Sequence, residues 1–360
     1  MPIIRSALAA CVAATSSTPL LAQSPTLAPP RGSSVVPVAP GVFVILHPRA
    51  TDNFPNGNSM VVVGDDGVLV VDTGYLPSVA REDIAWIKTL TPKPVRYVVN
   101  THWHYDHNNG NADYRKAFPG VEIVAHRETQ RLIALNSARY AAGVVVEGSG
   151  SRKTLEAYRT QLTSDTSLTP VERDTVRARI AQREREMEEM GTLAVEPPTR
   201  TFDRELNLRL GGRQIRLLHL ARGNTPGDVV VWLPAEQVVA VGDLLVHPIP
   251  YAYNSIPHEW VAFLRGVDSL GARTIVPGHG PVFRDPAYLR QVTGLLESVV
   301  NHVFAGYRAG QTVDQVRAGF DFGPWRDRFA GTNDFLRRVF DGSIVTALVD
   351  RAFLAAGGGL

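Results

Sequence analysis

The sequence predicts an α/β fold in which two mixed β-sheets lie between outer layers of helices. Short Val-rich segments bounded by Gly, Pro and Asp occur in both halves of the chain, which is typical of buried strands. Helical segments separate these strands in the order strands, helices, strands, helices, and this order favours a layered sandwich. A chain of 360 residues with 44% apolar residues can fill the core of one large domain or two modest ones.

The first predicted sheet comes from the first half of the chain. Apolar residues at helical spacing predict a helix over residues 77–90, and another helix begins near Arg127. The two Val-rich runs of residues 59–74 flank an acidic Gly turn, which indicates a hairpin. The predicted strands of this half are residues 41–47, the two runs of 59–74, 95–100 and 121–126.

A charged helical segment interrupts the strand pattern between Gly150 and Gly191. Its apolar residues form two helical stripes, Leu155, Tyr158 and Leu162 in one and Val176, Ile180 and Met187 in the other. The run from Thr169 to Glu172 resembles a capping box with Pro at the first helical position. We therefore predict a helical hairpin within a mostly helical insertion over residues 138–200. We favour a solvated pair of helices on the flank of the domain; a lid or a dimerisation arm is the alternative.

Strands return in the second half of the chain. Residues 201–220 form a predicted hairpin with a Gly-Gly turn, and residues 228–246 give two more strands. A helix over 257–270 and a strand over 274–278 follow, and the remaining segments are mostly helical. We assign residues 35–300 to one sandwich domain and residues 301–360 to a C-terminal helical extension.

The N-terminus has the pattern of a secretory signal peptide. Residues 1–22 contain one early charge, Arg5, followed by small and apolar residues and a small-residue site near Ala22. This stretch is too short and too weakly apolar for a membrane-spanning helix, so we expect a periplasmic or secreted protein. Residues 23–34 form a predicted flexible Pro/Ser linker. Lipoprotein anchoring through Cys11 ranks second, because very few apolar residues precede it.

Composition excludes several partners and ligand types. The net charge is +2 and the basic residues are dispersed, so we expect a small-molecule substrate and no nucleic-acid partner. Cys11 is the only cysteine, and its removal with the signal peptide would leave no thiol to bind a metal. Metal ligands must then be His, Asp, Glu or Asn. The helical hairpin and the C-terminal helices leave a homodimer open.

A cluster of histidines follows the predicted strand at 95–100. His102, His104, Asp106 and His107 lie within six residues of a chain that has ten histidines. A loop at the end of a strand can turn alternate side chains toward one point. Neutral imidazoles suit Zn²⁺ and similar ions, and a carboxylate adds charge and can hold a proton. The cluster therefore predicts a metal site, whereas a plain polar turn would not need this composition.

The cluster, THWHYDH, resembles the H-x-H-x-D-H signature of the metallo-β-lactamase superfamily. Three further segments, VLVVDTG, VVAVGDLL and VPGHGPV, resemble other motifs of that family in the expected order. The resemblance covers about residues 35–285 and implies an αββα sandwich, in agreement with the pattern above. It implies that Asp72 supports the metal site without binding a metal, that Asp243 bridges two metals, and that His279 binds the second.

One position departs from the family pattern. In ARGNTPGD, Asn224 stands where the family usually has a histidine that completes the first metal site. Asn is neutral and is a weaker zinc ligand, so His102, His104 and Asn224 would form the weaker site. The stronger site would contain Asp106, His107 and His279, with Asp243 shared. We expect one or two zinc ions per chain, with iron as the alternative metal; His219, which lies within a strand pattern, is expected to pack structurally.

The resemblance implies a metal-dependent hydrolase. A zinc-activated hydroxide would attack the carbonyl of a β-lactam, a lactone or another amide or ester. Asp106 would act as the catalytic residue that orients the nucleophile and carries its proton to the leaving group. His247, Tyr251 and Tyr253 share one loop and are the candidates for lining the substrate site. The alternatives are a mononuclear iron oxidoreductase and a degenerate, non-catalytic metal-binding protein, the second motivated by Asn224.

Overall fold

The computed structural model describes residues 32–47 and 56–360. The predicted signal peptide at 1–22, including Cys11, lies outside these residues, as does most of the predicted linker. Ser34, the last residue of that linker prediction, is already the first residue of strand β1 (Ser34–Ala39).

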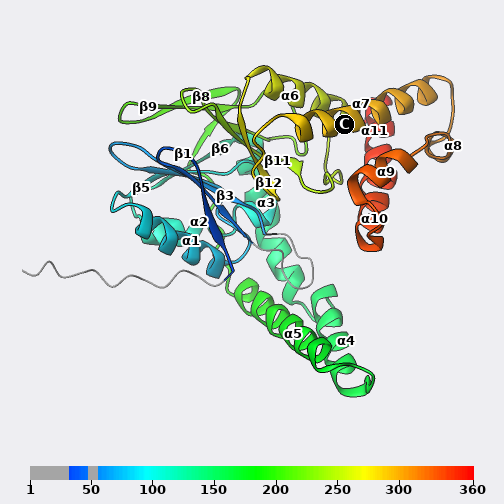
Figure 1. The fold of residues 1–360 in the computed structure, drawn as a ribbon, viewed down its shortest axis with the longest axis horizontal. Helices are drawn as coiled ribbons and strands as arrows, with labels where there is room; N and C mark the ends of the chain where they lie inside the picture. The colour runs from blue at the N-terminus through cyan, green and yellow to red at the C-terminus, as the bar shows by residue number, and fades with distance from the viewer. Residues whose placement is uncertain (1–31, 48–55) are drawn as a thin grey trace, which may run out of the picture.

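Two mixed sheets lie face to face at the centre of the molecule (Figure 1). The seven-stranded sheet has the order β1, β2 (Val42–Leu46), β3 (Ser59–Val63), β4 (Val68–Val71), β5 (Val95–Val99), β6 (Glu122–His126) and β7 (Arg200–Phe202). Its neighbours are antiparallel up to β4 and parallel from β4 to β7. The five-stranded sheet has the order β12 (Thr274–His279), β11 (Val238–Val246), β10 (Val230–Leu233), β9 (Arg213–Leu218) and β8 (Glu205–Leu210), with only β11 and β12 parallel.

Side-chain alternation along the strands produces the layers. In β4, Leu69 and Val71 enter the core between the sheets, whereas Val68 and Val70 face the opposite side. On that outer side they pack against α1 (Pro77–Leu90) and α2 (Asn111–Ala117). The predicted αββα sandwich of two mixed sheets is therefore confirmed.

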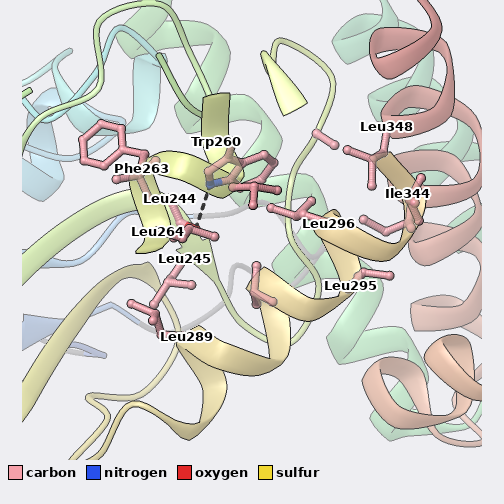
Figure 2. Close-up of a cluster of buried hydrophobic side chains, with 14 of the residues drawn as sticks. Leu244, Leu245, Trp260, Phe263, Leu264, Leu289, Leu295, Leu296, Ile344 and Leu348 are labelled. Carbon is pink, nitrogen blue, oxygen red and sulfur yellow. Dashed lines mark hydrogen bonds between the residues drawn. The ribbon is translucent and has the colours of Figure 1, made fainter. Parts of the chain in front are cut away.

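Helices α6 (Pro257–Ser269) and α7 (Ala287–Arg308) cover the outer face of the five-stranded sheet. Figure 2 shows Trp260 at the centre of this layer, where its indole nitrogen donates to the Leu244 carbonyl at 3.3 Å. Ile344 and Leu348 belong to the same buried cluster. Both come from a π-helical stretch (Asp341–Leu348). This stretch follows α8 (Val313–Ala318), α9 (Gly323–Ala330) and α10 (Asp334–Phe340), and α11 (Val349–Ala356) follows it.

The C-terminal helices and the domain share one core. The boundary proposed at residue 300 falls inside the continuous helix α7, because both halves of that helix bury residues in the cluster around Trp260. The predicted extension is therefore packed on the sandwich over a common apolar interior.

The predicted hairpin is present as α4 (Gly150–Ser164) and α5 (Pro170–Gly191), which extend away from the sheets (Figure 1). Thr169 and Glu172 form the predicted capping box at the start of α5. The predicted start of the insertion, residue 138, lies inside α3 (Arg127–Val145), which continues without a break to Val145. At the base of the hairpin, the Tyr75 hydroxyl donates to the buried Glu186 at 2.5 Å, which fixes α5 to the segment after β4.

The sequence pattern missed β1 and did not separate β7 from the hairpin predicted at 201–220, whose two strands are β8 and β9. β1 pairs with β2, the first predicted strand, and contains Pro37. Proline cannot donate a backbone hydrogen bond, and β1 is accordingly an edge strand. Within residues 32–47 and 56–360, no helix combines the length and apolarity needed to cross a membrane.

Candidate metal centre

The candidate metal centre lies where strand ends from both sheets meet. β4 and β5 are parallel neighbours, so Asp72 and the loop after Val99 leave the first sheet at the same edge. β11 and β12 are parallel neighbours in the second sheet and carry Asp243 and His279. The two parallel pairs bring four separate stretches of sequence to one point.

The ligating atoms form two groups. The first contains His102, His104 and Asp243, and the second contains Asp106, His107 and His279; within each group these atoms all lie within 4.8 Å of one another. Asp243 faces both groups. Its Oδ2 lies 3.4 Å from His102 Nε2, whereas its Oδ1 lies 3.3 Å from His107 Nε2 and 3.3 Å from His279 Nε2. The structure thus brings together the His and Asp residues named from the sequence, with Asp243 in contact with histidines of both groups.

Hydrogen bonds outside the centre fix the tautomers of the second group. His107 Nδ1 lies 2.8 Å from an oxygen of Asp72, and His279 Nδ1 lies 3.1 Å from the carbonyl of Asn56. A carboxylate and a carbonyl only accept, so both Nδ1 atoms carry hydrogen. The Nε2 atoms of neutral His107 and His279 therefore present lone pairs to the centre.

The same reasoning applies to the first group. The Thr101 hydroxyl donates to Asp72 at 2.7 Å, so it accepts from His102 Nδ1 at 2.9 Å. His104 Nε2 lies 3.0 Å from the side-chain oxygen of Asn254. His102 Nε2 and His104 Nδ1 are then the lone-pair atoms, 2.9 Å apart. Two lone pairs at this distance repel each other unless a proton or a cation lies between them.

These residues fit a metal ion. Four imidazole lone pairs converge with the carboxylates of Asp106 and Asp243, which is the donor set that zinc and iron prefer. Among the residues described, Asp243 Oδ1 is buried and has no hydrogen-bond partner. A buried acceptor without a donor is costly, and a cation would satisfy it.

The electrostatic potential is more negative at the second group. Burial opposes the protonation of His279, but Asp243 and Asp106 outweigh burial and raise its pKa to about 9. In contrast, burial and the neighbouring His107 lower the pKa of His102 to about 4. Burial opposes the ionisation of Asp106, but His107 and His279 outweigh burial and lower its pKa to about 2, so Asp106 is ionised at neutral pH and adds a negative charge to the second group. The carboxylates of Asp106 and Asp243 therefore favour positive charge at the second group more than at the first.

Asn224 is fully buried beside the first group. Its amide nitrogen donates to the carbonyl of Tyr251, whose ring lies 5.5 Å from that of His104. That bond fixes the orientation of the amide, and Asn224 Oδ1 has no partner in the part of the chain described. Asp228 holds the surrounding turn by accepting from the Thr225 backbone at 2.6 Å. Asn224 therefore offers a neutral oxygen at the position where the family pattern has a histidine.

The three predicted substrate-site residues lie together. His247, Tyr251 and Tyr253 line a cavity of about 530 Å³, and His279 lines it as well. His219 lies outside the two groups: its ring stacks on His126 with centroids 4.1 Å apart, and its Nδ1 bonds the Asp228 carbonyl. The structural role expected for His219 is confirmed.

Sequence reasoning missed three contributors. Thr101 directly precedes the histidine motif and links His102 to Asp72. Its position next to His102 is the sequence feature that could have indicated this role. Asn254 reaches His104 from 150 residues further along the chain. Asn56 orients His279 through a backbone carbonyl, which side-chain patterns do not reveal.

Comparison with known proteins agrees with this geometry. Linear primary-alkylsulfatase of Pseudomonas sp. (strain ATCC 19151) is 26% identical over 227 residues, which cover 61% of this chain and 40% of the relative. The alpha subunit of 2,4-dinitroanisole O-demethylase of Nocardioides sp. (strain JS1661) is 33% identical over 227 residues, covering 61% of this chain and 52% of the relative. The chain thus matches about half of the length of each.

Solved structures show the same fold. A metallo-beta-lactamase from Pontibacter korlensis superposes with a TM-score of 0.52 at 21% identity, over 74% of this chain and 99% of that one. FIM-1 from Pseudomonas aeruginosa, in its mono-zinc form, gives a TM-score of 0.51 at 18% identity, over 75% and 98% of the chains. The family model of the metallo-beta-lactamase superfamily matches residues 52–279. The protein described here is therefore a member of the metallo-beta-lactamase superfamily.

Proposed function

We propose that this protein is a zinc-dependent hydrolase that acts on a small-molecule ester or amide. The observation that carries the proposal is the pair of ligand groups that share Asp243 and border a cavity at His279. One or two zinc ions fit these donors, and the second group would bind the first ion because its potential is more negative. Bound zinc lowers the pKa of water to near neutrality, which supplies a hydroxide nucleophile at pH 7.

The chain's own residues would then orient the reactants. Asp106 is ionised at neutral pH, since its pKa is lowered to about 2. Its carboxylate can accept a hydrogen bond from the attacking water and hold the proton that the leaving group takes. His279 lies 3.1 Å from Asp106 and lines the cavity, so the substrate would approach from that side.

The names of the relatives widen the range of bonds to be tested. One acts on linear primary alkyl sulfates and another on 2,4-dinitroanisole, so relatives of this chain are not limited to β-lactams. Attack on a carbonyl remains the leading reaction because it needs only the nucleophile and a stabilised oxyanion. We also propose export, on the pattern of residues 1–22; cell fractionation with an antibody to the chain would test it.

The test combines elemental analysis with a substrate panel. The purified protein would be assayed with a chromogenic cephalosporin, a simple lactone, a 4-nitrophenyl ester and an alkyl sulfate. We expect bound zinc and turnover of at least one substrate, and we expect His279→Ala to abolish that turnover. His219→Gln is the matched control, because His219 bonds only outside the ligand groups. Bound iron with oxygen uptake and no hydrolysis would replace the proposal by the oxidoreductase, and a chain without metal or turnover would support the degenerate alternative.

A further inference from the structure

The cavity beside His279 adjoins the ligand groups and extends beyond them. It lies between the ends of β2 and β11, the loop from β11 to α6, and α10. We propose that this cavity binds a neutral alkyl or acyl chain of the substrate and that α10 determines this selectivity. The inference rests on the proposed hydrolase and names the class of ester that it would accept.

The cavity is continuous with the candidate metal centre. His279, a member of the second ligand group, is also part of the cavity wall. Tyr251, on the opposite wall, has its ring 5.5 Å from the ring of His104 in the first group. A chain that occupies the cavity would therefore have its reactive end beside both groups. Its volume of about 530 Å³ lies within the range of small-molecule sites.

The wall is suited to hydrocarbon. Its apolar members come from β2, β11, the following loop and α10, and none of the described residues that line it is Asp, Glu, Lys or Arg. A bound carboxylate would find no lysine or arginine among them. Two histidines of the wall, His47 and His279, are already paired with Asp83 and Asp106. An alkyl chain gains from burial against the apolar members of the wall.

Several polar atoms of the wall are already engaged. The Ser343 hydroxyl donates to the Pro250 carbonyl at 2.6 Å and accepts from the Ala252 backbone at 2.9 Å. Both ring nitrogens of His47 are bonded, one to the carbonyl of Gly57 and the other to Asp83. A hydrocarbon guest would break none of these bonds, so its burial costs no hydrogen bonds there.

Helix α10 supplies a part of the wall that lies outside the family match. Phe335, Leu336 and Val339 lie on one helical face by their spacing and line the cavity. Phe335 and Val339 are 39% and 37% exposed, so part of each side chain can contact a ligand. All three lie beyond residues 52–279, the part that matches the family. Helix α10 therefore adds apolar surface to a cavity whose remaining wall comes mostly from the sandwich and its loops.

The wall is held in place before a ligand arrives. Ser343, in the π-helical stretch directly after α10, bonds the loop between β11 and α6. Further along, the Arg351 guanidinium donates to the Ser255 carbonyl at 2.7 Å. These contacts join the C-terminal helices to the loop that forms the opposite wall, so the ligand would not have to order it.

The test measures binding without turnover. The purified protein would be titrated calorimetrically with 1-hexanol, 1-heptanol and 1-octanol, which are neutral and cannot be hydrolysed. We expect saturable binding whose affinity rises about fourfold for each added methylene. Val339→Trp should reduce the affinity for 1-octanol at least about tenfold, since the indole occupies the cavity. Arg338→Trp is the matched control on the exposed side of α10 and should bind as the wild type does.

A second variant distinguishes loss of the binding surface from misfolding of Val339→Trp. Phe335→Ala removes apolar surface from the wall without adding bulk, and it should weaken 1-octanol binding several-fold while the unfolding transition stays close to the wild type. Affinity that does not depend on chain length, or that falls equally in Val339→Trp and Arg338→Trp, would overturn the proposal. If the alcohols bind as expected but no ester is hydrolysed, the cavity assignment stands and the proposed hydrolase fails. If an ester is hydrolysed but the alcohols do not bind, the proposed hydrolase stands and the cavity assignment fails.

Discussion

Asp72 provides the sharpest test of how the candidate centre is built. Its carboxylate is 2% exposed and accepts from the Thr101 backbone at 2.8 Å, from the Thr101 hydroxyl at 2.7 Å and from His107 Nδ1 at 2.8 Å. The substitution Asp72→Asn keeps the size of the side chain. It also keeps the backbone, because Asp72 has φ 61° and Asn adopts this left-handed conformation readily.

The substitution changes one oxygen into an amide donor. The Thr101 backbone N–H requires the remaining oxygen of the substituted side chain to face it, so the new NH₂ group faces His107 Nδ1 and the Thr101 hydroxyl. His107 can keep its contact only as an acceptor, which transfers its hydrogen to Nε2. The lone pair that faced the second ligand group is then lost. Loss of such a supporting partner typically lowers metal affinity about 10- to 100-fold, or about 1.4 to 2.7 kcal/mol.

The assay is a titration with a chelator of known zinc affinity, followed by elemental analysis. We expect Asp72→Asn to lose metal from the second group at a chelator concentration that leaves the wild type loaded. Asp83→Asn is the control, because Asp83 is equally buried and histidine-bonded yet pairs with His47, outside both ligand groups. Unchanged metal affinity in folded Asp72→Asn protein would refute the tautomer argument. An equal loss of metal affinity in Asp72→Asn and Asp83→Asn would mean that both substitutions act by general destabilisation of the fold.

Three further predictions concern the metal and pH. Asn224→His replaces a neutral oxygen by an imidazole, so we expect the first group to hold metal more tightly and turnover to rise; lower metal content by elemental analysis would contradict this. Burial opposes the charge of His47, but the attraction of Asp83 outweighs burial and raises the pKa of His47. The ion pair between His47 and Asp83 therefore stabilises the fold fully below about pH 6.5, and this stabilisation is lost as the pH rises through the pKa of His47 in the folded protein. Urea unfolding should therefore show His47→Gln about 3 to 5 kcal/mol less stable than the wild type at pH 6 and a smaller difference at pH 10, and an equal difference at both would argue against the charged pair. The pKa of His279 is raised to about 9, so this histidine carries a proton at pH 7 in the metal-free protein, and zinc binding at pH 7 should release that proton whereas binding above pH 10 should not. Calorimetry of zinc binding in buffers with different heats of ionisation would detect the released proton. Identical heats in these buffers at pH 7 would count against protonated ligands.

Much of the fold could be predicted from local patterns of apolar and turn residues. The two Val-rich runs of residues 59–74 predicted a hairpin, and the structure has β3 and β4 there as antiparallel neighbours. β1 was missed because it is short, lies at an edge and contains Pro37, so its residues lack the signal of a buried strand. The boundary proposed at residue 300 fell within α7, because the core that the helix shares with the C-terminal segments involves residues distant in sequence.

The sequence by itself determined the ligand chemistry. His102, His104, Asp106 and His107 are neighbours along the chain, so their convergence follows from a single loop after a single strand. Only the tertiary structure decided which nitrogen each histidine presents, because the partners that fix the tautomers, such as Asn254, come from distant loops. It also placed α10 against the cavity at His279. Contacts of this kind depend on how the whole chain packs, and no periodicity or spacing within a segment encodes them.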